Sequence, residues 1–188
     1  MKTALLLIDV QQSFVRRPYW NNAEVPDFLA HCNALVAGCA AQGVPVVRVL
    51  HVDGPEDRAP GDDAFALESG LIRPLDGLAD FDAALTLHKH RHSALAGTGL
   101  SIWLRRHGIG RLMVAGIRTE QCCETTTRHA SDEGFEVDFV TEATLTFDMA
   151  TPTGGVLTAA QVRERTATVL AGRFANLCTV GQALQRAA

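Results

Sequence analysis

Apolar runs of strand length alternate with segments of helical periodicity along most of the chain. Residues 3–10 (TALLLIDV) form a near-continuous apolar run, which is typical of a strand buried on both faces of a parallel sheet. The same criteria predict five further strands, at residues 44–52, 84–88, 111–116, 135–141 and 176–180. Helices are predicted between them, at residues 26–42, 99–107, 122–133 and 159–170 and at the C-terminal end.

This alternation of strands and helices predicts the fold class. It indicates an α/β protein, a three-layer α-β-α sandwich around a mainly parallel six-stranded sheet. Residues 53–80 are rich in proline and glycine and are predicted to form a loop. A length of 188 residues suits one domain, and no repeat or linker divides the chain, so we predict a single domain over residues 1–188.

Composition narrows the class of protein. With 47% hydrophobic and 20% charged residues, the chain is not disordered. The net charge is −4 and no basic run occurs, so no nucleic-acid partner is expected. No apolar stretch approaches the roughly 20 residues that span a bilayer, and the run 4–8 is too short for a signal-peptide core. We therefore expect a cytoplasmic protein without a membrane partner.

The five cysteines do not form a disulfide or zinc pattern. Their number is odd, Cys122 and Cys123 are adjacent, and no C-x-x-C pair occurs. Most of them are expected to be small core residues.

Three polar residues at or just beyond the ends of predicted strands are the candidates for chemistry. They are Asp9, Lys89 and Cys122. Each has an ordinary alternative interpretation: Asp9 as a cap, Lys89 as a solvated surface residue and Cys122 as a structural thiol. In parallel sheets, however, ligands bind beyond the carboxyl ends of the strands, and these ends would bring the three together. A carboxylate, an ammonium and a thiol near a predicted helix start are suited to nucleophilic acyl transfer.

Three sequence blocks resemble a known family. They are LLLIDVQQSF (5–14), KHRHSALAGTGL (89–100) and VAGIRTEQCCETTTRHASDEGFEV (114–137). Together the chain is similar to the isochorismatase-like cysteine hydrolases, which include nicotinamidases, N-carbamoylsarcosine amidases and isochorismatases. The resemblance implies that Cys122 is the nucleophile, Asp9 the proton shuttle and Lys89 the group that stabilises the thiolate.

The resemblance also implies an unusual peptide bond. Family members carry a non-proline cis peptide before the motif threonine, which corresponds here to Ile117–Arg118. In the family, this bond would aim backbone N–H groups, that of Cys122 included, at the developing oxyanion.

Differences from the sequence patterns of individual subfamilies exclude some of the family's reactions and ligands. Nicotinamidases bind a metal through an Asp-x-His pair, whereas this chain has His51-Val52-Asp53 in reversed order and no D-x-H, so no metal is expected. Whether His51, His88, His90 or His92 contacts a ligand stays open, and a solvated or interface face is the simpler interpretation of the last three. No dinucleotide or Walker motif occurs, so no cofactor is expected.

Five residues in or beside the expected strand-end loops are candidates for the substrate pocket. They are Phe14, Trp20, Arg118, Gln121 and Phe147. Arg118 lies within the motif and could pair with a substrate carboxylate. Aromatic residues at such places more often complete the core than contact a ligand.

The sequence is compatible with four functions. The first is a metal-independent amidohydrolase that cleaves a C–N bond of a small amide, ureide or carbamoyl compound through a thioester. The second is an isochorismatase-type vinyl ether hydrolase, although that reaction needs no cysteine nucleophile. The others are a non-enzymatic interaction domain and a redox protein using Cys122 and Cys123. The resemblance implies a small-molecule substrate and a homo-oligomer, either a dimer or a tetramer.

Overall fold

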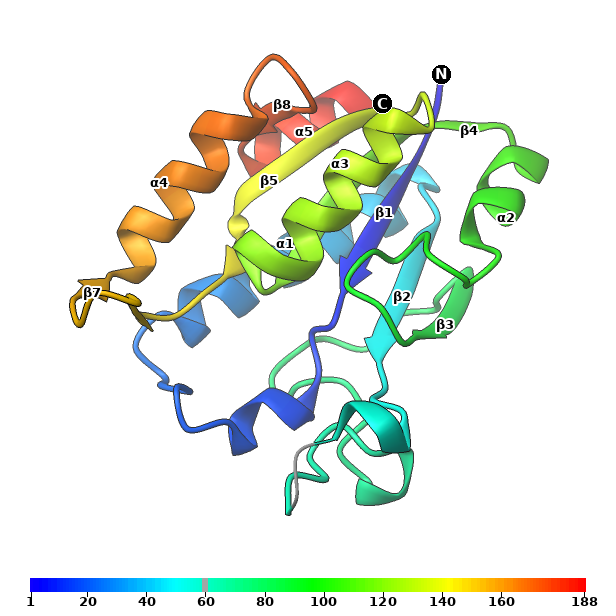
Figure 1. Ribbon diagram of the computed structural model, residues 1–188. Coiled ribbons are helices and arrows are strands. Elements are labelled where there is room, and N and C mark those ends of the chain that lie inside the picture. The colour runs from blue at the N-terminus through cyan, green and yellow to red at the C-terminus, as the bar shows by residue number, and fades with distance from the viewer. Residues whose placement is uncertain (59–60) are drawn as a thin grey trace.

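Six parallel strands form the main sheet of the computed structural model, which describes residues 1–58 and 61–188 (Figure 1). Their order across the sheet is β3-β2-β1-β4-β5-β8. The strands are β1 (Lys2–Ile8), β2 (Val46–His51), β3 (Leu85–Lys89), β4 (Ile109–Ile117), β5 (Glu136–Leu145) and β8 (Asn176–Cys178). The predicted α/β class and the six-stranded parallel sheet are confirmed.

Helices cover both faces of this sheet. The described part of the chain contains five α-helices: α1 (Val25–Gln42), α2 (Leu100–Arg106), α3 (Glu124–Asp132), α4 (Ala159–Leu170) and α5 (Val180–Ala187). Alternate side chains of β1 reach opposite faces, so Leu5 and Leu7 pack with α1 and α5 while Leu6 and Ile8 pack with α2, α3 and α4. Among the described residues, no helix combines the length and the apolar character needed to cross a bilayer.

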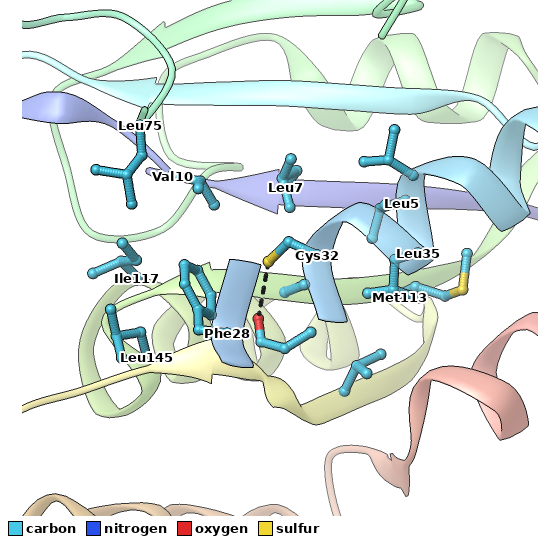
Figure 2. Close-up of a cluster of buried hydrophobic side chains, with 14 of the residues drawn as sticks. Leu5, Leu7, Val10, Phe28, Cys32, Leu35, Leu75, Met113, Ile117 and Leu145 are labelled. Carbon is cyan, nitrogen blue, oxygen red and sulfur yellow. Dashed lines mark hydrogen bonds between the residues drawn. The ribbon is translucent and has the colours of Figure 1, made fainter. Parts of the chain in front are cut away.

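The core on the α1 face explains part of the cysteine usage. Figure 2 shows Phe28, Cys32 and Leu35 of α1 packed against side chains of β1 and β4. The Cys32 thiol donates to the carbonyl of Ala143 at 3.8 Å and is fully buried. Burial raises the pKa of this thiol, and that of Cys39, so both act as small core residues.

Several predicted boundaries differ from the structure by about two residues or more, and two of these differences lie close to the functional end of the sheet. The helix predicted from Cys122 begins at Glu124, because the Cys123 N–H reaches five residues back to Arg118 and widens residues 119–123 into a π turn (η4, Thr119–Cys123). Strand β5 runs beyond the predicted end at Thr141, through an irregularity in its pairing with β4. The polar pair Thr141–Glu142 interrupts the apolar pattern there, so periodicity ended the strand too early.

The connections contain short elements that the pattern did not predict. Three are 3-10 helices, η1 (Gln12–Arg16), η2 (Pro55–Asp57) and η3 (Leu67–Ser69), and two form a small antiparallel pair, β6 (Met149–Ala150) and β7 (Val156–Leu157). Residues 59 and 60, inside the loop predicted at 53–80, lie outside the described residues.

Gly116 permits a close approach of β4 to β1 beside the functional end of the sheet. It pairs with Ile8, the residue before Asp9, and has a φ of +136°. A Cβ at this position would lie 1.9 Å from the carbonyl oxygen of Ile8. Any side chain at 116 would therefore push apart the two central strands.

We predict that Gly116→Ala lowers the free energy of unfolding by at least about 3 kcal/mol, because both the backbone conformation and the space exclude a Cβ. Urea unfolding followed by circular dichroism measures this. Gly181→Ala is the matched control, since Gly181 lies in α5 with no atom within 4 Å of its would-be Cβ, and it should gain up to about 1 kcal/mol. A Gly116→Ala protein as stable as the natural chain would contradict the close approach.

Candidate active site

Lys89 is the centre of the candidate site. It ends β3, its side chain has no exposure to solvent, and its Nζ is surrounded by three groups from other parts of the sheet edge. Asp9 Oδ2 lies 2.8 Å away, His51 Nδ1 2.9 Å and Cys122 Sγ 3.3 Å. The structure thus brings together the three residues predicted from the sequence and adds His51 to them.

Asp9 follows the last residue of β1 and leaves the strand in an unusual conformation. Its φ is +54°, the one positive value among the described non-glycine residues, and aspartate tolerates this region better than most side chains. The Asp9 N–H donates to the carbonyl of Val49 at 2.8 Å, which ties the turn to β2. The carboxylate is fully buried, and among the described residues it forms an ion pair with the Lys89 ammonium, which lies beside Oδ2. Oδ1 is a buried acceptor without a hydrogen bond from the described residues, and such an acceptor is costly unless it finds a donor.

The two adjacent cysteines face different surroundings. Cys122 lines a cavity at the carboxyl edge of the sheet, whereas Cys123 is fully buried in the core with α2 and α3. The predicted helix start at Cys122 does not hold, so the nucleophile candidate lies in the π turn η4 rather than at the first turn of α3. Cys122 is the cysteine of this pair that a small molecule can reach.

Burial and the neighbouring charges together raise the pKa of the Cys122 thiol. Burial raises the pKa of Cys122, the Asp9 carboxylate raises it further, and the Lys89 ammonium opposes both without overcoming them. Lys89 therefore acts in the direction that the sequence predicted, but a resting thiolate is not what the site favours. Burial alone would lower the pKa of Lys89, yet Asp9 and Cys122 outweigh it and the pKa is raised. The site thus holds a thiol and an ammonium whose pKa values are both raised, next to the side chain of Asp9.

The cavity above Cys122 has a volume of about 310 Å³. Its lining combines three aromatic rings with charged and polar side chains from four loops: Asp9, Phe14, Arg17, Tyr19, His51, Asp53, Asp57, Phe65, His90, Arg91, His92, Gln121 and Cys122. A larger hollow of about 600 Å³ lies next to it, between residues 16–18 and 61–71, and the two share Arg17. The larger hollow is lined by neither Asp9 nor Cys122, whereas the smaller one is lined by both, so we place the site in the smaller one.

The five pocket residues predicted from the sequence divide into two groups. Phe14 and Gln121 line the cavity. The other three predicted residues do not line the cavity, which corrects the prediction for Trp20, Phe147 and Arg118. Trp20 packs instead on Phe147, with 5.2 Å between ring centroids. Arg118 is buried, and its Nη2 lies 2.8 Å from Oε1 of Glu120. The guanidinium therefore forms an ion pair within the protein and is not available to pair with a substrate carboxylate. The Ile117–Arg118 peptide is cis, as the resemblance implied.

Several lining residues were not predicted, because they carry no motif and come from loops. Arg17 pairs with Asp62, lies 3.8 Å from Asp53 and covers the Phe65 ring at 4.6 Å. Pairs between residues so far apart in the sequence leave no periodic signal. The bend after Lys89 also brings His90 and His92, but not His88, to the cavity. The proline-rich composition of residues 53–80 pointed only to a loop.

No group of three metal-binding side chains is assembled among residues 1–58 and 61–188. The reversed pair seen in the sequence is joined internally, since His51 Nε2 lies 2.9 Å from Asp53 Oδ1. His90 Nδ1 donates to the carbonyl of Val52 at 2.8 Å.

Comparisons with known proteins agree with this architecture. The profile of the isochorismatase domain matches residues 3–173. The uncharacterised isochorismatase family protein YrdC of Bacillus subtilis (strain 168) is 25% identical, over 96% of this chain and 94% of that protein. Nicotinamidase 3 of Arabidopsis thaliana is 31% identical over 77% and 74%, respectively. The crystal structure of an isochorismatase-family protein from Chromobacterium violaceum ATCC 12472 superposes with a TM-score of 0.85 at 28% identity, covering 98% of this chain and 92% of that one.

We predict that substitutions of Lys89 and Asp9 change the reactivity of Cys122 in opposite directions. Lys89→Met removes the cation that stabilises the thiolate, so alkylation of Cys122 by iodoacetamide should slow at every pH below the pKa of the thiol. Asp9→Asn removes the anion that raises the pKa of the thiol, so alkylation should accelerate. Mass spectrometry of the Cys122 peptide measures both rates.

Cys122→Ala supplies the background from the other four cysteines. Equal changes of the same sign in the two variants would contradict the charge arrangement described above.

Proposed function

The chain belongs to the isochorismatase family of hydrolases, and we propose that it is a metal-independent cysteine amidohydrolase that cleaves the C–N bond of a small amide, ureide or carbamoyl compound. One observation carries the proposal: a thiol at the floor of a cavity lies 3.3 Å from a buried ammonium, which is itself 2.8 Å from a carboxylate. This is the set that nucleophilic acyl transfer requires. The name of the Arabidopsis relative, a nicotinamidase, supports amide chemistry.

Acylation begins with the proton of the Cys122 thiol. As the substrate displaces water from the cavity, Asp9 takes this proton and Sγ forms a bond to the carbonyl carbon. The carbonyl oxygen becomes the oxyanion of a tetrahedral intermediate. Asp9 then returns the proton to the amide nitrogen, the C–N bond breaks and the amine or ammonia leaves. Lys89 remains protonated throughout and stabilises the sulfur while it carries negative charge.

The oxyanion needs a donor close to Cys122. The N–H groups of Gln121 and Cys123 both donate to the carbonyl of Arg118 at 3.2 Å. We therefore assign the oxyanion to the N–H of Cys122 itself, within the same π turn.

Deacylation uses the same groups in reverse order. Asp9, again a carboxylate, takes a proton from water, and the hydroxide attacks the thioester carbon. The C–S bond breaks, the carboxylic acid leaves and Cys122 recovers the proton. One water is consumed, and one acid and one amine are produced, so Asp9 ends each cycle in its starting form.

The charges of the cavity favour an amide over an isochorismate-like acid. Such an acid carries carboxylates, and binding it would call for cations without partners. Both arginines of the described lining have partners, since Arg17 pairs with Asp62 and Arg91 Nη1 lies 3.2 Å from Asp57. Lys89, behind the lining, is paired with Asp9. An uncharged amide needs no such partner, and a vinyl ether hydrolase would not use the thiol.

The proposal is tested by measuring ammonia release from small amides, nicotinamide, ureides and carbamoyl amino acids. We expect at least one of them to be hydrolysed, and hydrolysis should continue after exhaustive chelation, because the nucleophile is a side chain rather than a metal-bound water. Activity that disappears with chelator and returns with zinc would overturn the metal-independent mechanism. Cleavage of isochorismate alone, with no ammonia from any amide, would favour the ether hydrolase.

Once a substrate is known, variants of Cys122 and Cys123 distinguish the nucleophile from the core residue. Cys122→Ser keeps the shape but offers a hydroxyl too weakly acidic for this site, so turnover should fall by at least about 10³-fold. Cys123→Ala removes one buried sulfur and should cost about 1 kcal/mol of stability with most activity retained. Rapid quenching should trap the acyl group on Cys122. An adduct on Cys123 would refute the mechanism.

A further inference from the structure

The ammonium of Lys89 has a third neighbour that the proposed mechanism does not use. We propose that His51, held as the neutral imidazole with its proton on Nε2, is a positioning residue that fixes the Lys89 ammonium between Asp9 and Cys122. The proposal rests on the proposed function for its catalytic meaning, although its geometry can be tested without a substrate. His51 acts through Lys89 and not on the reacting atoms.

The protonation state of His51 follows from its two contacts. An ammonium has three N–H groups and no lone pair, so Lys89 can only donate to Nδ1, which lies 2.9 Å from Nζ. Nδ1 must then be unprotonated, and in a neutral ring the proton is on Nε2. There it meets an acceptor, the Asp53 carboxylate, at 2.9 Å. Both ring nitrogens are thereby assigned.

The ring of His51 is held in place from several sides. His51 ends β2 and pairs in register with Lys89 of β3, so the two side chains leave the sheet as neighbours. The buried side chain of Gln11 accepts from the His51 N–H at 2.7 Å and donates to its carbonyl at 3.0 Å. The Phe65 ring meets the imidazole edge-on, with 5.8 Å between centroids. This rigidity is what a positioning residue needs.

The contact with His51 gives the third N–H group of the Lys89 ammonium an acceptor. Asp9 and Cys122 occupy two of the three donor directions of the buried ammonium, and a third direction without an acceptor would leave a buried N–H unsatisfied. His51 fills that direction. Removal of the acceptor frees the ammonium to rotate or withdraw from Sγ, and the thiolate loses part of its stabilisation.

Acid should break the same contact. A protonated His51 would lose its lone pair on Nδ1 and place a second cation 2.9 Å from the first. The charged groups that face the ring are Lys89 from β3, Asp9 after β1, Asp53 after β2 and, beyond Asp53, Arg17 after η1. Burial and Lys89 lower the pKa of His51, and the two carboxylates oppose them without overcoming them. The ring is therefore neutral at neutral pH.

The first test measures the ring directly. In ¹⁵N NMR spectra of histidine-labelled protein, assigned by the signal that His51→Asn removes, Nδ1 should be unprotonated and Nε2 protonated at neutral pH. The ring should titrate below its ordinary value of about 6.5. In Lys89→Met the pKa of His51 should rise, because the cation that lowers it is gone. A proton on Nδ1, or a His51 pKa that does not respond to Lys89→Met, would overturn the proposal.

The second test measures the effect on Cys122 by its alkylation rate as a function of pH. His51→Leu removes the acceptor and should slow alkylation about tenfold or more, equivalent to one pKa unit. His51→Asn supplies an amide oxygen near the place of Nδ1 and should restore most of the rate. His88→Leu and His88→Asn, at an exposed position one residue before Lys89 and outside the cavity lining, are the matched controls and should match the natural chain.

A His51→Leu protein alkylated at the natural rate, or a His51→Asn protein as slow as His51→Leu, would refute a positioning role. If His51→Leu does not fold, the NMR measurement still decides. Failure of the proposed function looks different: no amide would be hydrolysed, while the ring assignment and the alkylation rates would follow the expectations above.

Discussion

The ammonium of Lys89 has no exposure to solvent, and the other groups of the site are arranged around it. Removing such a charge from water costs several kcal/mol, and only close acceptors compensate for it. Lys89 finds them in Asp9, Cys122 and His51, which come from the ends of β1, η4 and β2. The strand order β3-β2-β1-β4 brings these ends to one edge, so the topology of the sheet supplies the acceptors. The ends of three elements of the fold therefore meet at Nζ of Lys89, where the proposed reaction needs a cation.

The backbone around Lys89 also helps to bring Asp9 and Cys122 to this edge of the sheet. Asp9 leaves β1 with a positive φ, and Gly116 lets β4 approach β1 at Ile8, next to Asp9. The π turn that follows β4 then presents Cys122 to the cavity and Cys123 to the core. Each of these local features departs from regular secondary structure, and all of them lie where the strands end. Irregular backbone is concentrated where function requires it.

Much of this could be predicted from the sequence, for physical reasons. Buried parallel strands leave continuous apolar runs, and the carboxyl ends of such strands meet at one edge. Polar residues that end such runs, Asp9 and Lys89, are therefore candidates on the hydrophobic pattern alone. Cys122 is a candidate on its place after a strand, and the resemblance to a family motif makes it the nucleophile. Phe14 and Gln121 of the cavity lining were predicted, but Arg17, Asp53 and Phe65 could not be, because they meet through loops whose geometry has no period. The prediction for Arg118 was wrong because its partner Glu120, only two residues away, neutralises it inside the protein.

The positions of the protons around Lys89 define how the site works, and neutron crystallography of the perdeuterated protein at neutral pH would locate them. We expect deuterium in three positions on Nζ of Lys89, on Sγ of Cys122 and on Nε2 of His51. We expect none on the Asp9 carboxylate or on Nδ1 of His51. A deuteron on Asp9 with a bare Cys122 sulfur, a Lys89 nitrogen with only two deuterons, or a deuteron on His51 Nδ1 would contradict this arrangement.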